Sequence, residues 1–211
     1  MAEYPFLPAP ALFIVLSGPS GAGKSTLMRR FLERNPGVDR CLSVTTRAPR
    51  GEERDGVDYH FVSDAEFTRR RENNEFLEWA QVFGRHGYAT PRAGVVASLN
   101  AGRSVIKDVD VQGGAQIRAS FPAAVQVFVV PSSRAEIERR LRTRATDTEA
   151  QIARRLAEAD AELAQWRAYD HLILSDELEA AALDLDAIVR AERLRISRAG
   201  PAPASPSSPS P

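Results

Sequence analysis

The glycine-rich run from 18 to 25 contains the residues of this chain that are best suited to chemistry. Its letters, GPSGAGKS, follow the pattern G-x-x-x-x-G-K-[ST], between an apolar stretch at 12–17 and an amphipathic one at 24–34. Glycines let backbone N–H groups turn inward around phosphate oxygens, and the next helix points the positive end of its dipole at them. We therefore predict a phosphate-binding loop, called the P-loop below, with a plain glycine-rich turn as the alternative.

Lys24 and Ser25 supply the side chains that such a loop needs. The Lys24 ammonium is placed to reach β- and γ-phosphates, and the Ser25 hydroxyl to hold Mg²⁺. The chain has 28 basic residues, yet the only lysines are Lys24 and Lys107. A compact ammonium suits the P-loop better than a planar guanidinium does, so a lysine at this position supports the prediction.

A second group of candidate residues lies in the polar stretch 45–62. Arg47 and Arg50 are three residues apart on a backbone that Pro49 stiffens, and Tyr59 follows them. Two guanidinium groups and a phenol hydroxyl suit a phosphate dianion. The stretch therefore predicts an anion site, with a solvated basic loop as the alternative.

Two carboxylates, Asp108 and Asp110, follow another apolar stretch. Because they are two residues apart on a predicted strand, we expect them to point to the same face. If they are buried together they need cations or hydrogen-bond donors, and Asp108 is the better candidate for the water shell of Mg²⁺. Capping of the next helix is the alternative.

The elements that must position these groups alternate between strands and helices. Apolar and β-branched stretches predict strands at 12–17, 41–45, 76–83, 104–109, 125–130 and 171–174. Helical spacing and caps predict helices at 24–34, 63–72, 95–100, 112–119, 134–141, 149–166 and 178–195, with a loop at 84–91. This order predicts an α/β fold with a doubly wound parallel sheet and ligands at the C-terminal ends of its strands.

Composition narrows the function classes. The 211 residues and 43% hydrophobic content suit one α/β domain with inserted subdomains, and the zero net charge points to neither nucleic acid nor an anionic membrane as a partner. The lone Cys41 allows no disulfide within the chain, and no targeting or membrane-length segment is evident, so we expect a cytoplasmic protein. The stretch 199–211, almost entirely Pro, Ser and Ala, predicts a disordered tail.

In combination, these motifs resemble those of guanylate kinases, the enzymes that phosphorylate GMP with ATP. The resemblance spans residues 12–195 and continues through the stretches 73–80, 107–113 and 144–149. It implies a P-loop nucleoside-monophosphate kinase fold, with a GMP-binding insertion near 45–91 and a lid near 139–156. It also implies transfer of the γ-phosphate of ATP to GMP with Mg²⁺, giving ADP and GDP, in purine nucleotide metabolism and GMP recycling.

The resemblance also implies a role for each matching residue. ATP binding is assigned to the P-loop and its neighbour: Gly18, Pro19, Ser20, Gly21, Ala22, Gly23, Lys24, Ser25 and Thr26. The GMP phosphate is assigned to Arg47, Arg50, Tyr59 and Tyr88, and guanine to Ser43, Glu78, Thr90 and Asp110. The catalytic residues are Lys24, Asp108 and two arginines of the lid, Arg144 and Arg155.

The chemistry of guanine agrees with the role of Glu78. Guanine offers paired N1–H and N2–H donors that a carboxylate accepts, whereas adenine presents a bare N1 acceptor that a carboxylate repels. The hydroxyls of Ser43 and Thr90 suit guanine O6 as donors. We expect the neighbouring Trp79 to pack in the core. Near the lid we expect most of four other arginines to be solvated helix charges: Arg139, Arg140, Arg142 and Arg154.

The chain departs from the family pattern at four positions. Ala89 and Ala145 stand where glycine is usual, Ser175 stands where an asparagine often holds adenine, and Lys107 is unusual before an aspartate. Two other functions compete with the kinase. A non-catalytic module of the same fold typically loses P-loop residues, and a kinase for a phosphorylated sugar does not need both Glu78 and Asp110. The sequence leaves the oligomeric state and the acceptance of dGMP open.

Overall fold

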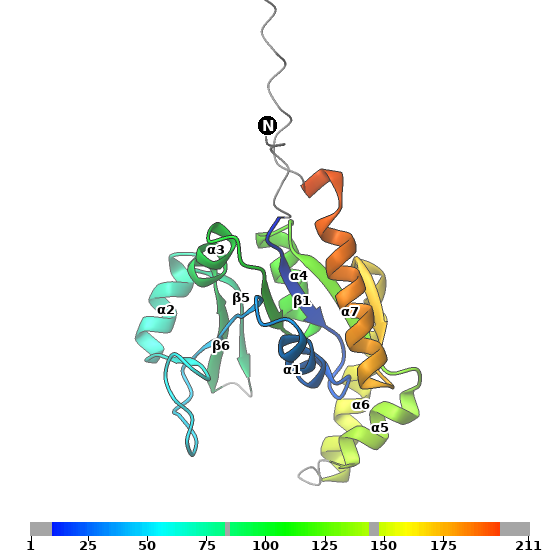
Figure 1. Cartoon of the computed structure of the whole chain (residues 1–211). Helices are drawn as coiled ribbons and strands as arrows, with labels where there is room; N and C mark the ends of the chain where they lie inside the picture. The colour runs from blue at the N-terminus through cyan, green and yellow to red at the C-terminus, as the bar shows by residue number, and fades with distance from the viewer. Residues whose placement is uncertain (1–9, 83–84, 144–147, 199–211) are drawn as a thin grey trace, which may run out of the picture.

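The computed structural model describes residues 10–82, 85–143 and 148–198, which form an α/β fold around a five-stranded sheet (Figure 1). In spatial order the strands are β2 (Asp39–Arg40), β7 (Val105–Asp108), β1 (Phe13–Ser17), β8 (Val125–Val130) and β9 (His171–Leu174). Every neighbouring pair is parallel. The predicted parallel sheet is confirmed, and the C-terminal ends of its strands meet along one edge.

Helices cover both faces of this sheet, which explains why its central strand β1 (Phe13–Ser17) is buried along its whole length. The covering helices are α1 (Lys24–Arg34) and α7 (Leu178–Arg193) on one face, and α3 (Arg92–Asn100) and α4 (Val111–Ser120) on the other. In β1, Ile14 and Leu16 pack toward α1 and α7, while Phe13 and Val15 pack toward α3 and α4. All four side chains are at most 1% exposed, so both faces of the strand lie in the core.

A second, four-stranded sheet projects beside the first one (Figure 1). Its strands in spatial order are β4 (His60–Phe61), β3 (Val44–Thr45), β6 (His86–Pro91) and β5 (Phe76–Val82). Helix α2 (Asp64–Glu72) packs on it through Phe67. The Ser63 hydroxyl accepts a hydrogen bond from the Glu66 N–H at 3.2 Å, so the predicted cap of this helix is confirmed.

Two sequence predictions for this region are wrong. Only the last two residues of the predicted strand at 41–45 form a strand. β2 ends at Arg40 in the first sheet, and β3 begins at Val44 in the second. The predicted loop at 84–91 contains β6, which pairs with both β3 and β5. Gly87 resembles a turn residue, but a Cβ there would lie 2.7 Å from the Phe67 ring. That glycine is needed for close packing, which a local pattern does not reveal.

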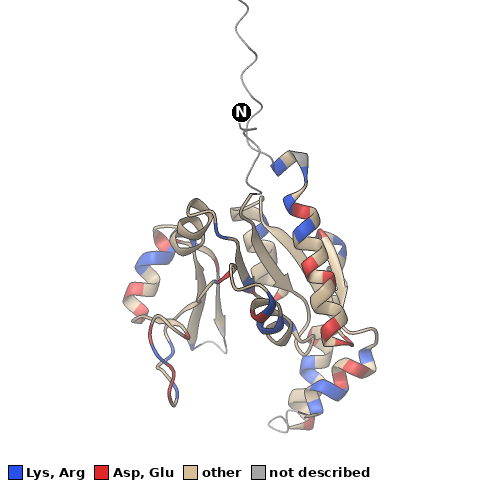
Figure 2. Ribbon diagram, viewed as in Figure 1, with Lys and Arg blue, Asp and Glu red and all other residues tan. Residues whose placement is uncertain are grey.

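A helical pair forms the other projection of the molecule. It consists of α5 (Arg134–Thr143) and α6 (Glu149–Leu163), followed by the short 3-10 helix η1 (Trp166–Ala168). Ile137, Leu141, Ile152 and Leu156 pack between the two long helices. Both basic and acidic residues lie along these two helices (Figure 2). Among the described residues, no helix has the length and apolar character needed to cross a membrane.

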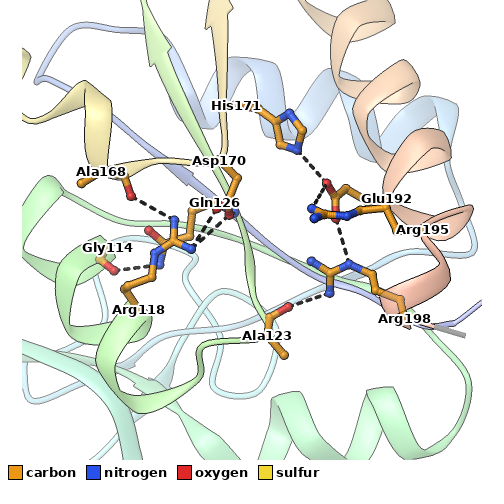
Figure 3. A network of polar contacts seen from close by, with 10 residues as sticks. All are labelled: Gly114, Arg118, Ala123, Gln126, Ala168, Asp170, His171, Glu192, Arg195 and Arg198. Atoms are coloured by element: carbon orange, nitrogen blue, oxygen red, sulfur yellow. Dashed lines mark hydrogen bonds and ion pairs between the residues drawn. The ribbon is translucent and has the colours of Figure 1, made fainter. Parts of the chain in front are cut away.

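A buried carboxylate ties the end of α7 to the sheet (Figure 3). The Glu192 side chain is 3% exposed and accepts hydrogen bonds from Arg195 at 3.0 Å and Arg198 at 2.8 Å. It also lies 2.9 Å from Nε2 of His171, and Arg198 donates to the Ala123 carbonyl at 2.8 Å. Burial alone would raise the pKa of Glu192, but the hydrogen bonds from His171, Arg198 and Arg195 outweigh it and lower the pKa.

We expect this cluster to set the C-terminal limit of the stable fold. Deletion of residues 195–211 removes both arginines from a buried carboxylate, which should lower the free energy of unfolding by about 2–4 kcal/mol. Deletion of 199–211 is the control and should leave it unchanged. Because folding lowers the pKa of Glu192, its contribution is present above the ordinary value near 4.5 and fades as the pH falls. Urea melts of both truncations measure this, and equal stabilities would contradict it.

Candidate active site

The P-loop connects β1 to α1 at the C-terminal edge of the parallel sheet. Gly18 has a φ of 140°, and a Cβ there would lie 2.1 Å from the carbonyl oxygen of Val129, so only glycine fits. Gly23, with a φ of 89°, is the N-cap of α1, so the N–H groups of the first helical turn face the loop. The Lys24 ammonium folds back over the loop and donates to the carbonyls of Gly18 at 2.6 Å and Pro19 at 3.0 Å.

Ser25 and Asp108, the two predicted metal-side residues, are in direct contact. The Ser25 hydroxyl donates to Oδ2 of Asp108 at 2.6 Å. Burial would raise the pKa of Asp108, but the charge of Lys107 and the hydrogen bond from Ser25 outweigh it, so the carboxylate is ionised at neutral pH. Hydroxyl and carboxylate oxygens are the ligands that Mg²⁺ prefers, so the residues present fit that ion.

A cavity of about 310 Å³ opens beside this pair. Its lining residues are Gly18, Ser20, Lys24, Asp108, Val109, Asp110 and Glu162. It is therefore bounded by the P-loop, by the segment that follows β7 and by α6. The mixture of one ammonium, several backbone groups and carboxylates suits phosphate groups that bring a metal ion with them.

Helix α6 reaches the P-loop through two side chains that contact the same residue. Nη2 of Arg155 donates to the Ser20 hydroxyl at 2.7 Å, so this predicted lid arginine lies at the loop. Oε2 of Glu162 accepts from the Ser20 N–H at 3.2 Å, and burial raises the pKa of that carboxyl despite the hydrogen bond. Glu162 was not identified from the sequence. Arg144, the other predicted lid arginine, lies outside the described residues, as does Ala145.

A second cavity, of about 380 Å³, lies on the other side of the P-loop. Among its lining residues are Gly21, Gly23, Thr26, Arg140 and Ser175. Arg140 donates to the Ser175 carbonyl at 2.7 Å and to the Ala22 carbonyl at 3.3 Å. Arg140 is therefore an exception among the arginines near the lid, most of which were expected to be solvated helix charges, because its planar fork joins the P-loop to the turn after β9.

The predicted base-reading residues Glu78 and Thr90 face each other across β5 and β6. The Thr90 hydroxyl donates to Oε1 of Glu78 at 2.6 Å, and the Glu78 residue is 8% exposed. Burial raises the pKa of Glu78, although the Thr90 hydrogen bond and the charge of Lys107 oppose this. A Cβ at Gly113 would lie 3.3 Å from Oε2 of Glu78, so the absence of a side chain there leaves room beside that oxygen.

Asp110 lies at the same place but not in the predicted conformation. It is the N-cap of α4, and its Oδ1 accepts from the Gly113 N–H at 2.7 Å, whereas Asp108 is the last residue of β7. The prediction that the two aspartates share one face of a strand is wrong, because the chain turns into the helix between them. Capping occupies one oxygen of Asp110, and the charge of this carboxylate still acts on Glu78.

The predicted anion site gathers around Arg47, which is 6% exposed. Its guanidinium makes a two-point contact with the Glu53 carboxylate at 2.8 and 2.9 Å, and its Nε donates to the Tyr88 hydroxyl at 3.1 Å. The Tyr59 ring lies 5.3 Å from the same guanidinium. In this structure the Glu53 carboxylate therefore stands where a phosphate would bind the arginine fork. Arg50 is exposed, and its N–H donates to the same carboxylate.

Two further predictions concern residues near this pocket. Ser43 directly precedes β3, and its carbonyl accepts from the His60 N–H at 2.8 Å. Its hydroxyl makes no hydrogen bond within the described part of the chain, and its assignment to guanine stays a prediction. The expectation that Trp79 packs in the core is wrong, because the residue is 38% exposed and stacks under Arg71. It alternates with the buried Glu78 along β5 and so points to the opposite face.

Comparison with known proteins agrees with this geometry. The family model described as guanylate kinase matches residues 11–192. A guanylate kinase of Anaeromyxobacter dehalogenans is 52% identical over 88% of this chain and 83% of its own length, and one of Aromatoleum aromaticum is 47% identical over 88% and 91%. The crystal structure of guanylate kinase from Anaplasma phagocytophilum is 33% identical, with a TM-score of 0.72 over 92% of each chain. The chain belongs to the guanylate kinase family.

Proposed function

We propose that this chain transfers the γ-phosphate of ATP to GMP, giving ADP and GDP. The observation that carries the proposal is the short segment from Asp108 to Gly113, which touches both halves of the site. Asp108 contacts Ser25 of the P-loop, and Gly113 lies beside Glu78 of the second sheet. A phosphate donor at the P-loop and a guanine at Glu78 would thus meet at this segment. Membership of the guanylate kinase family supports the same reaction.

In this proposal ATP lies along the P-loop. The cavity beside Arg140 and Ser175 takes the adenosine end, and the cavity beside Lys24 and Asp108 takes the γ-phosphate. Mg²⁺, held by Ser25 with Asp108 at its water shell, supplies positive charge at the transferred phosphate when it is bound. The backbone N–H groups of the loop and the Lys24 ammonium orient the phosphate chain, and Arg155 adds charge from α6.

The acceptor needs positioning more than activation. A GMP phosphate is already an anion, so no strong base has to remove a proton before it attacks. Arg47, Tyr59, Tyr88 and Arg50 are placed to hold this phosphate once it displaces Glu53. Positioning two polyanions in line, with their charge neutralised, then accounts for the rate.

The second sheet supplies base selection. Glu78 accepts the N1–H and N2–H donors of guanine, while Thr90 and Asp110 stand on either side of it. In a buried pocket the wrong base leaves these groups unpaired, which makes discrimination strong. A cytoplasmic location belongs to the same proposal. A non-catalytic module is disfavoured because the P-loop lysine and Asp108 line one cavity, and Arg155 contacts Ser20 of the same lining.

Replacement of Lys24 by alanine tests the donor half. We expect Lys24→Ala to fold normally, since the loop backbone still forms, but to lose turnover by about a hundredfold or more because charge at the transferred phosphate is lost. Coupled detection of ADP with Mg-ATP and GMP measures this, and a melting curve checks the fold. Near-normal turnover would show that the P-loop assignment is wrong.

Replacement of Glu78 by glutamine tests the acceptor half. One acceptor oxygen becomes an NH₂ donor that opposes a guanine donor, so kcat/KM for GMP should fall by about a hundredfold. AMP should lose much less, because adenine N1 can accept from the new amide. The same ADP assay over GMP, AMP, CMP, UMP and ribose phosphates measures the ratio of kcat/KM for GMP to kcat/KM for each other acceptor. Asp58→Asn, a change on the exposed loop of the same subdomain, is the control. Equal loss for GMP and AMP would make Glu78 merely structural.

A further inference from the structure

Two adjacent glycines near the start of α4, Gly113 and Gly114, make room for different groups. A Cβ at Gly113 would lie 3.3 Å from Oδ1 of Asp110 and 3.3 Å from Oε2 of Glu78, so two carboxylates flank this bare position. A Cβ at Gly114 would lie only 2.6 Å from the Tyr169 hydroxyl. The start of α4 therefore contacts both the base pocket and a tyrosine that comes from the far end of the chain.

Two consecutive hydrogen bonds connect this tyrosine to the residue that begins α4. The Tyr169 hydroxyl donates to Oγ of Ser17 at 2.9 Å, and the Ser17 hydroxyl donates to the carbonyl oxygen of Asp110 at 2.9 Å. Ser17 is the last residue of β1 and is fully buried. The same Asp110 carbonyl accepts a helical hydrogen bond from the Gly114 N–H at 2.9 Å. Because Ser17 has a single hydrogen to donate, Tyr169 supplies the hydrogen of the other bond.

Further hydrogen bonds hold the neighbours of Tyr169 against α4 and β8 (Figure 3). Arg118 of α4 donates to the carboxylate of Asp170, the next residue, at 2.9 Å. That carboxylate also accepts from the backbone N–H of Gln126 at 2.8 Å. The side chain of Gln126 in turn donates to the Gly114 carbonyl at 2.8 Å. The position of the tyrosine hydroxyl is thus fixed relative to the start of α4.

We propose that Tyr169 is a positioning residue for guanine recognition, whose hydroxyl acts through Ser17 to hold Asp110 in place. The inference rests on the guanine-reading role proposed above for Asp110. The amino group of guanine has two hydrogens, so it can donate one to Glu78 and the other to Asp110. A small displacement of the Asp110 carboxylate would weaken its share of this contact, because a hydrogen bond depends steeply on distance and angle.

Replacement of Tyr169 by phenylalanine tests the inference. It removes the hydroxyl and keeps the ring, which packs on Phe128 with centroids 4.9 Å apart. IMP is the probe, since its base lacks the amino group of guanine but keeps N1–H and O6. In Tyr169→Phe the KM for GMP should rise about fivefold, while kcat and the KM values for IMP and ATP change by less than about twofold. Coupled detection of ADP with the whole chain and Mg-ATP measures these constants.

Two further variants show whether the effect runs through Ser17. Ser17→Ala removes the other hydroxyl of the pair and should lower the preference for GMP over IMP by a similar factor. The double variant should lose little more than either single one, since both act through one connection. Ser98→Ala is the matched control, because it also removes a single hydroxyl, which joins α3 to Asp39 of β2 at 2.6 Å. It should leave the preference unchanged.

An equal loss for GMP and IMP, a raised KM for ATP, or an unchanged preference in Tyr169→Phe would overturn the inference. If that variant melts early, Ser17→Ala carries the same test. Asp110→Asn separates the inference from the role on which it rests, because its oxygen can still cap α4 while its amide opposes the guanine amino group. If Asp110→Asn keeps the preference for GMP, the role of Asp110 is wrong and the inference falls with it. If Asp110→Asn loses the preference and Tyr169→Phe keeps it, Tyr169 alone is rejected.

Discussion

The contact between Ser25 and Asp108 is the interaction on which the rest of the site depends. It joins the first turn of α1, the helix that follows β1, to the end of β7. β1 and β7 are neighbours in the parallel sheet although they are far apart in the sequence. Because the chain turns into α4 directly after Asp108, the cap at Asp110 and the open position at Gly113 are fixed relative to the P-loop. The position of Glu78 in the second sheet is therefore set relative to the P-loop, which the proposed in-line transfer would require.

The parts of this structure that were predictable are those written in local patterns. The P-loop needs glycine at positions 18 and 23 because the backbone has a positive φ there, and the glycine-rich motif indicates this in the sequence. β8 is mostly apolar because its residues are buried in the core. Family motifs extended this to Glu78 and Thr90, which the structure brings to a hydrogen bond of 2.6 Å. These features could be predicted because each one depends on only a few neighbouring residues.

The parts that were missed depend on residues distant in the chain. β6 is a strand because it pairs with β3 and β5. Its Gly87 cannot carry a side chain because the Phe67 ring packs against it. Nothing in the local sequence distinguishes Arg140 from the other charged residues of its helix, because its contact with the turn after β9 forms only in the folded protein. No spacing rule connects Glu162 with Ser20, which are 142 residues apart. Such contacts follow from tertiary packing, which overrides local propensity.

Carboxylates of the chain itself occupy both of the sites that we propose to bind phosphate. Glu53 fills the fork of Arg47, and Glu162 accepts from the Ser20 N–H at the P-loop. A cationic side chain in a partly buried pocket destabilises the fold if it is unpaired before phosphate binds. Pairing with a carboxylate of the same chain removes that cost. Nucleotide binding then exchanges one anion for another, so the net gain per ion pair is smaller than the gross attraction. That limit matters for a kinase, since products whose phosphates are held too firmly would leave slowly. Lys107 differs from these exchangeable cations, because the carboxylate beside its ammonium, Asp108 at 3.5 Å, follows it directly in the chain.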